Sequence, residues 1–156
     1  AIVMLRDPAE RAFSHYCSNV KNGIEQLDFG EALKKEPERL HNPRTTFEKE
    51  SSPFSYVDRG RYFQQLQGFA RLIGWQNIHC ILLSDLLRNM REEAKRLFKF
   101  LGVTEPPQAL ELPHRNESGR SELSKANRRF IVCELLNDIE LLEQYLDRDL
   151  TRWKQW

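Results

Sequence analysis

Apolar residues at the start of the chain form a short run that changes abruptly into a helical pattern. Ile2 to Leu5 is continuous, apolar and partly β-branched, which predicts a strand buried on both faces of a parallel sheet. Asp7 then offers an N-cap oxygen, Pro8 suits the first helical position, and Glu10 completes a capping box. The pattern therefore predicts a helix over about 8–22.

The same order of strand and helix returns in the middle of the chain. A stripe of apolar residues predicts a core-facing helix that ends near Gly74. Residues 77–83 are mostly apolar and predict a second buried strand, and an amphipathic helix that stops at Gly102 follows. Two successive βα units indicate an α/β fold in which helices flank a parallel β-sheet. The stripe before the second strand consists of Tyr62, Leu66, Phe69, Leu72 and Ile73.

The remaining segments predict a short helix, a long loop and a terminal helix. The short helix covers residues 28–35, and residues 36–58, rich in Pro, Ser, Thr and charge, predict a long surface loop. Near the end of the chain, apolar residues on one stripe predict an amphipathic helix that docks on the body of the protein. That stripe consists of Val132, Leu135, Leu136, Ile139, Leu142 and Leu146.

Length and composition limit what these elements can form. With 156 residues and a net charge of +1, the chain fits one domain over 1–156. Lys and Arg are spread along its length, so no nucleic-acid footprint is indicated. The apolar runs are shorter than a membrane span. Because a buried strand is predicted at the first residues, we expect the chain to be the later portion of a larger domain.

Three cysteines, Cys17, Cys80 and Cys133, lie far apart in the sequence. Their odd number and apolar or helical surroundings favour buried thiols over a disulfide framework or a zinc site. Buried thiols are typical of a reducing compartment, so we expect a cytoplasmic protein.

The first strand–helix junction carries candidate phosphate-binding chemistry. Ligands of open α/β sheets bind beyond the carboxyl ends of the strands, and Arg6 follows the first strand at that point. Ser14 lies just over two helical turns further on, and a planar guanidinium and a hydroxyl can hold one phosphate together. Pairing of Arg6 with Glu10 is the structural alternative. His15 is expected to pack or hydrogen-bond structurally rather than to act as an acid–base catalyst.

A loop before the terminal helix concentrates hydrogen-bond donors around one glycine. Such loops can wrap an anion with backbone and side-chain donors. A plain exposed linker is the alternative. The candidate residues are Arg115, Asn116, Ser118, Gly119, Arg120 and Ser121.

The run "LRDPAERAFSHY" resembles the 3′-phosphate-binding motif of sulfotransferases that use 3′-phosphoadenylyl sulfate (PAPS). The segments that follow are similar, in order, to the later half of bacterial and glycan-directed sulfotransferases. They are "RGRYFQQL", a strand, "SDLL", "FKFLGV", "HRNESGR" and a helix that ends in "DLTRW". The resemblance covers nearly the whole chain and implies a P-loop-NTPase-like sulfotransferase fold that lacks its N-terminal part.

This resemblance implies an enzyme that transfers a sulfuryl group from PAPS to a hydroxyl or amine acceptor without a metal ion. It implies that Arg6 and Ser14 bind the 3′-phosphate. It also implies that a late loop closes over the cofactor. The site would bind adenosine 3′,5′-bisphosphate as well, since this is what remains of PAPS after the transfer. The residues implied for that loop are Arg115, Asn116, Gly119 and Arg120.

Two parts of the family's site are expected before this chain begins. They are the glycine- and lysine-rich loop that holds the 5′-phosphosulfate and the general base, so the catalytic residues stay unknown and the chain alone is expected to be inactive. The expected partners are a small-molecule or glycan acceptor and the N-terminal part of the same protein, with no nucleic acid. Golgi lumen is the alternative location for a glycan sulfotransferase, since Asn116 begins a glycosylation sequon.

Two other classes of function stay open on the sequence alone. One is a non-catalytic module that binds nucleotides or sulfated glycans through Arg6, Arg115 and Arg120. The other is a kinase-like phosphotransferase, which needs a complete P-loop and a magnesium-binding Ser or Thr.

Overall fold

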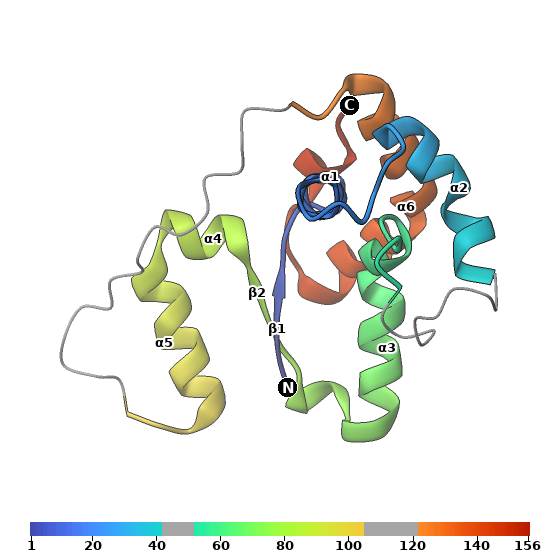
Figure 1. The fold of residues 1–156 in the computed structure, drawn as a ribbon. Coiled ribbons are helices and arrows are strands. Elements are labelled where there is room, and N and C mark those ends of the chain that lie inside the picture. Colours follow the sequence, from blue (N-terminus) through green and yellow to red (C-terminus); the bar gives the residue numbers. More distant parts are fainter. Residues whose placement is uncertain (42–51, 105–121) are drawn as a thin grey trace. The chain divides into compact units, whose positions relative to one another are not determined.

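The computed structural model describes residues 1–41, 52–104 and 122–156 (Figure 1). These residues form two compact units. The first, here called the sheet unit, contains the described residues of 1–6 and 65–119. The second, here called the helical unit, contains those of 7–64 and 120–156.

Two strands, β1 (Ile2–Leu5) and β2 (His79–Leu82), form the sheet unit's parallel sheet. The register pairs Ile2 with His79 and Leu5 with Leu82, so both strands end at the same edge. The helices α4 (Leu83–Arg88) and α5 (Met90–Leu101) follow β2 and pack against it. The parallel sheet flanked by helices confirms the predicted fold class.

The burial of β1 differs from the prediction. Leu5 is buried, whereas Ile2 is 51% and Met4 is 56% exposed. The prediction of a strand buried on both faces is therefore wrong for these two residues. The physical reason is that β1 pairs with β2 alone among the described residues, and a two-stranded sheet leaves most of its surface open to solvent.

Helix α3 (Tyr62–Ile73) has its first residues in the helical unit and the remainder in the sheet unit. Tyr62 and Leu66 are buried, as the apolar stripe predicted. Phe69, Leu72 and Ile73 are exposed, and Leu72 reaches 83%. The core-facing prediction is wrong for that half of the helix, because the described residues leave its apolar face uncovered.

The helical unit is built from α1 (Pro8–Lys21), α2 (Phe29–His41) and α6 (Lys125–Leu146). Two short 3₁₀ turns, η2 (Asp58–Gly60) and η4 (Thr151–Lys154), pack against α1 and α6 respectively. A third, η3 (Trp75–Asn77), precedes β2 in the sheet unit.

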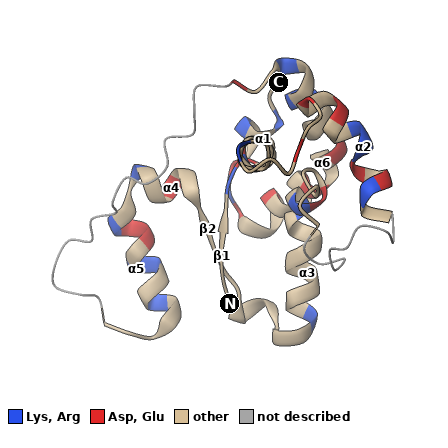
Figure 2. Cartoon of the chain, in the orientation of Figure 1, with Lys and Arg blue, Asp and Glu red and all other residues tan. Residues whose placement is uncertain are grey.

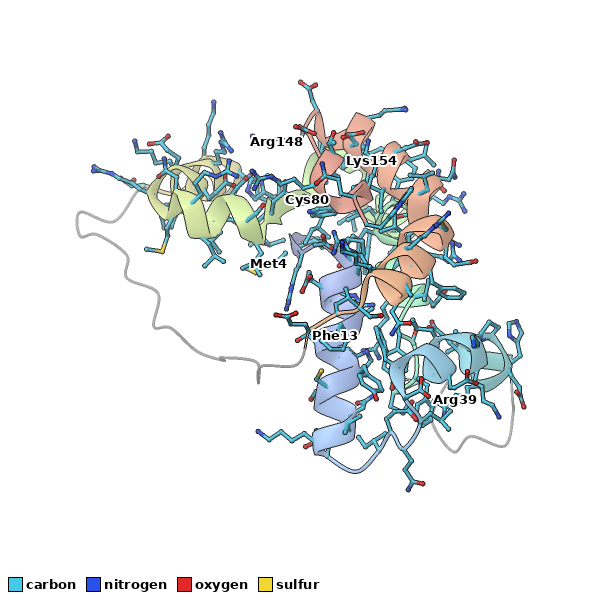
Figure 3. All side chains as sticks on the ribbon, turned by 90° about the horizontal axis from the view of Figure 1, so that it is seen from above. Met4, Phe13, Arg39, Cys80, Arg148 and Lys154 are labelled. Carbon is cyan, nitrogen blue, oxygen red and sulfur yellow. The ribbon has the colours of Figure 1, made fainter. Side chains whose placement is uncertain are left out.

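The predicted docking of the terminal helix is confirmed. Its buried apolar residues are Ile131, Val132, Leu135, Ile139 and Leu142. Leu136, which the sequence placed on the same stripe, is 36% exposed and lies off the buried face. Aromatic rings from α1, α2 and the segment before η2 complete this core. The ring centroids of Phe13, labelled in Figure 3, and Phe29 are 5.3 Å apart, and those of Tyr16 and Phe29 are 4.7 Å apart.

Helix α2 runs further than predicted, to His41 instead of residue 35. It contains Pro37, although proline removes a backbone donor and crowds the preceding turn. The helix continues because it is held through buried Glu36, which accepts hydrogen bonds from backbone N–H groups, and through half-buried Arg39, which pairs with Glu25. Two charged residues, one buried and one half-buried, gave no hydrophobic signal for this extension.

Two features near the second strand complete the comparison with the predicted elements. The short helix α4 was not predicted. Helix α5 was, and Asn89 caps its first turn by accepting a hydrogen bond from the Glu92 N–H at 3.3 Å. Gly102 ends it with a φ of 67°, a left-handed conformation that favours glycine.

All three cysteines are free thiols. Cys17 and Cys80 are half-buried, and burial raises the pKa of Cys80 to about 11. Cys133 is exposed, so the prediction of three buried thiols is wrong at that position. Among the described residues, no helix is long and apolar enough to cross a membrane. Figure 2 shows acidic and basic residues interspersed on the helices.

Candidate phosphate-binding site

Helix α1 begins at Pro8 with Asp7 as its N-cap, as the sequence predicted. Oδ1 of Asp7 accepts hydrogen bonds from the backbone N–H groups of Ala9 at 2.9 Å and Glu10 at 3.2 Å. Pro8 occupies the first helical position and is buried. The cap satisfies donors that the first turn leaves unpaired, so the start of the helix is well defined.

The second oxygen of Asp7 pairs with an arginine of α6. Nη2 of Arg128 lies 2.6 Å from Oδ2 of Asp7, and Nη1 lies 3.5 Å from Oε1 of Glu10. The same guanidinium donates to the carbonyl oxygens of Arg152 at 3.1 Å and Gln155 at 2.6 Å. Sequence reasoning missed Arg128, because its partners lie up to 121 positions away.

Arg6 and Ser14, the two residues predicted to hold the 3′-phosphate, flank the capped turn along the chain. Both side chains are half-buried. Arg6 closes the first segment of the sheet unit, and Ser14 lies in α1 of the helical unit. Their joint contact with one phosphate stays a prediction, as does the alternative pairing of Arg6 with Glu10.

The other four predicted site residues lie outside the described residues. They are Arg115, Asn116, Gly119 and Arg120, and their place in a cofactor loop stays a prediction.

His15, next to Ser14, packs against a buried tyrosine. Its ring lies edge-on to Tyr56 with the centroids 5.2 Å apart. The pKa of His15 is lowered to about 4, mainly by burial and then by the positive charges of Arg59 and Arg11. A hydrogen bond with the backbone of Ser55 opposes this shift and is the smallest of these effects. A ring that is neutral at physiological pH and packed on an aromatic side chain favours the structural role over acid–base catalysis.

Arg11 is a charged residue that the sequence analysis did not single out. Its Nη2 donates a hydrogen bond to the backbone carbonyl of Tyr56. Burial lowers the pKa of Arg11, and the Tyr62 side chain opposes that shift. Arg11 therefore ties α1 to the segment that leads into η2.

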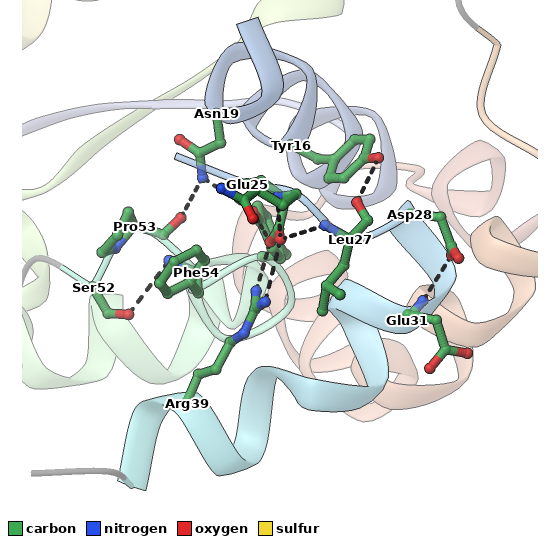
Figure 4. A network of polar contacts seen from close by, with 12 residues as sticks. Tyr16, Asn19, Glu25, Leu27, Asp28, Glu31, Arg39, Ser52, Pro53 and Phe54 are labelled. Carbon is green, nitrogen blue, oxygen red and sulfur yellow. Dashed lines mark hydrogen bonds and ion pairs between the residues drawn. The ribbon is translucent and has the colours of Figure 1, made fainter. Parts of the chain in front are cut away.

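A buried carboxylate, Glu25, organises the segment between α1 and α2 (Figure 4). It is 3% exposed and pairs with Arg39 at 2.5 Å. It also accepts hydrogen bonds from the Tyr56 hydroxyl at 2.9 Å and the Leu27 N–H at 3.0 Å. Burial raises the pKa of Glu25, but these contacts outweigh it and hold the pKa at about 2.

Glu36 plays a comparable part at the entry to η2. Its carboxylate accepts hydrogen bonds from the backbone N–H groups of Val57 at 2.7 Å and Asp58 at 2.8 Å. Burial raises the pKa of Glu36 and outweighs these bonds. Glu25 is held by Tyr56, Arg39 and a backbone N–H, and Glu36 by two backbone N–H groups, so both act as structural anchors for the turn beside α1.

Metal chemistry has no candidate in the part of the chain that the structure describes. No group of three or more His, Cys, Asp or Glu side chains there is arranged to hold an ion.

Three comparisons relate this geometry to known proteins. The sulfotransferase domain model matches residues 1–121, which contain both Arg6 and Ser14. The crystal structure of a sulfotransferase from Alicyclobacillus acidocaldarius is similar, with a TM-score of 0.78 and 28% sequence identity. The match covers 99% of this chain and 57% of that one, so this chain spans little more than half of the relative's length. No curated protein matches.

The family match, the parallel βα units and the capped strand–helix junction agree with one another. They confirm the resemblance that the sequence motifs indicated. The chain belongs to the sulfotransferase domain family.

Proposed function

We propose that this chain forms part of an enzyme that transfers a sulfuryl group from PAPS to a hydroxyl or amine acceptor. In the proposed site Arg6 and Ser14 bind the 3′-phosphate, and the late loop with Arg115 and Gly119 closes over the nucleotide. The observation that carries the proposal is the sulfotransferase match over residues 1–121, a range that contains the motif with Arg6 and Ser14.

The chemistry assigns these residues a binding role. The acceptor oxygen or nitrogen forms a bond to sulfur as the bond from sulfur to the 5′-phosphate oxygen breaks, and adenosine 3′,5′-bisphosphate leaves. The acceptor proton passes to a general base that lies outside the residues assigned here. A second phosphate anchor far from the sulfur orients the donor for in-line transfer and contributes remote binding energy.

The donor set suits this ligand. A 3′-phosphate is a dianion, and a guanidinium with a neighbouring hydroxyl supplies charge-assisted hydrogen bonds to it. A metal ion is not part of the proposed scheme. We propose a cytoplasmic location because Cys17, Cys80 and Cys133 are free thiols, which is typical of a reducing compartment. We also propose that residues 1–156 alone bind PAPS weakly without transferring the sulfuryl group.

The test uses the protein at its natural length, PAPS labelled in the sulfuryl group, and a panel of alcohols and amines. We expect label in an acceptor together with an equal amount of adenosine 3′,5′-bisphosphate. Binding of PAPS with no transfer to any acceptor would favour the non-catalytic module instead. Transfer of phosphate from ATP would favour the kinase-like phosphotransferase.

A further inference from the structure

Asp7 performs two tasks with its two carboxylate oxygens. Oδ1 caps the first turn of α1, and Oδ2 accepts a hydrogen bond from Nη2 of Arg128. An N-cap needs only an acceptor oxygen, and Asn or Ser supplies one about as well as Asp. The negative charge of Asp7 is therefore explained by Arg128 rather than by the cap.

Arg128 is fully occupied by the contacts it makes. A guanidinium has five N–H donors. Its three nitrogens make five contacts within 3.5 Å, with both oxygens of Asp7, with Glu10, and with the carbonyl oxygens of Arg152 and Gln155. No donor is left over for a ligand, so any effect of Arg128 on the site passes through Asp7 and Glu10 at the start of α1.

The Asp7–Arg128 pair is partly shielded from water. The two side chains are each 18% exposed, which places the pair between surface and buried ion pairs. Such a pair is screened less than an exposed one and has the bidentate geometry that arginine provides. It joins the start of α1, the first turns of α6 and the segment around η4 at one point.

Helix α1 transmits this constraint to the candidate site. Ser14 lies in the same helix, seven positions after Asp7, and seven residues make nearly two full turns. Fixing the helix start therefore fixes the face on which Ser14 stands. It also fixes the backbone at the residue that directly follows Arg6.

We propose that Arg128 is a positioning residue for the 3′-phosphate site, holding Asp7 and the start of α1 in the orientation from which Ser14 meets the phosphate. This inference rests on the proposed function. It adds a residue of the terminal helix, which lies beyond the segment matched by the family model, to the determinants of donor recognition.

The chain offers a matched control for this proposal. Lys154 of η4 lies 2.5 Å from the carboxylate of Glu143 in α6, and their side chains are 24% and 25% exposed. This pair joins the same helix to the same terminal turn through residues other than Asp7, Glu10 and Arg128. Its loss reports what a broken ion pair does to the unit as a whole.

The experiment compares Arg128→Gln, Asp7→Asn and Lys154→Gln in the protein at its natural length. Calorimetry measures the affinity for adenosine 3′,5′-bisphosphate and for adenosine 5′-monophosphate, which lacks the 3′-phosphate. We expect Arg128→Gln to weaken bisphosphate binding about tenfold, equivalent to about 1.4 kcal/mol, and to leave monophosphate binding within about twofold. Asp7→Asn keeps the cap and should give the same selective loss, and the double variant should be no worse than the stronger single one.

Each other outcome is informative. Lys154→Gln is expected to lower the melting temperature without changing the ratio of the two affinities. If Arg128→Gln leaves the ratio of the two affinities unchanged, with or without an equal loss for both ligands, the positioning role is overturned. A wild-type preference for the bisphosphate would still support the proposed function in that case. A wild-type protein with no preference for the bisphosphate would contradict the phosphate site itself, and the positioning role with it.

Discussion

Tyr56 donates its hydroxyl proton to the carboxylate of Glu25 across 2.9 Å, and both side chains are buried. The same hydroxyl accepts a hydrogen bond from Asn19 of α1 at 3.1 Å, and Glu25 pairs with Arg39 of α2. These contacts fasten α1, α2 and the segment before η2 to one another. The helical unit that carries Ser14 therefore depends on a polar network as well as on an apolar core.

Removing the Tyr56 hydroxyl tests that network. We expect Tyr56→Phe to lower the free energy of unfolding by about 1.5–3 kcal/mol, the range for hydrogen bonds to charged groups. Tyr16→Phe is the matched control, because the Tyr16 hydroxyl donates to the neutral carbonyl of Leu27 at 3.0 Å. It should cost about 0.5–1.5 kcal/mol. Urea denaturation measures both, and equal losses would contradict the special role of Glu25.

The charge of Glu25 predicts a dependence of stability on pH. Its pKa is held at about 2 in the folded protein, below the ordinary value of 4.5. The unfolded chain therefore binds more protons at low pH, and the stabilisation present above pH 4.5 is lost as the pH falls towards 2. Urea denaturation over that range should show a shallower pH dependence for Glu25→Gln than for the wild type. An identical pH dependence would show that Glu25 is not the group responsible.

Two glycines predict stability changes of opposite sign. A Cβ on Gly60 would lie 2.7 Å from Cδ1 of the buried Leu135 and 3.3 Å from Cβ of Pro8, at the start of α1. Gly60→Ala should therefore destabilise by about 1–3 kcal/mol, as overpacking does in a close-packed core.

Gly68 lies within α3 with nothing within 4 Å of an added Cβ. Gly68→Ala should stabilise by about 0.5–1 kcal/mol, because glycine is a poor helix former. Thermal melting that gave both changes the same sign would contradict this packing.

The sequence predicted features that depend on neighbouring residues and missed those that depend on contacts between distant ones. The cap at Asp7 and Pro8 was predicted because its hydrogen bonds span two or three residues. The extension of α2 was missed because Glu36 and Arg39 are held by partners 14 to 22 positions away.

Sequence patterns also described surroundings that the structure corrects. A run of apolar residues such as that around Met4 predicts burial, but burial depends on what covers the strand, which periodicity does not contain. At the candidate site, Arg6 and Ser14 were found through a short motif. Arg128 carries no local signal, since its partners are Asp7 and two carbonyl groups near the end of the chain.

The 3′-phosphate distinguishes PAPS from common adenine nucleotides, and Arg6 is the residue that we propose to bind it. In the protein at its natural length, Arg6→Ala removes a charge-assisted bond to a dianion and should weaken binding of adenosine 3′,5′-bisphosphate by about 2–4 kcal/mol. Ser14→Ala removes one hydroxyl donor and should cost about 1.5–3 kcal/mol. Because both residues act on one phosphate, the double variant should lose less than the sum of the single losses. Calorimetry with adenosine 5′-monophosphate is the control, and its affinity should hardly change in any of the variants. An equal loss for both nucleotides would mean that Arg6 supports the strand–helix junction and does not read the 3′-phosphate.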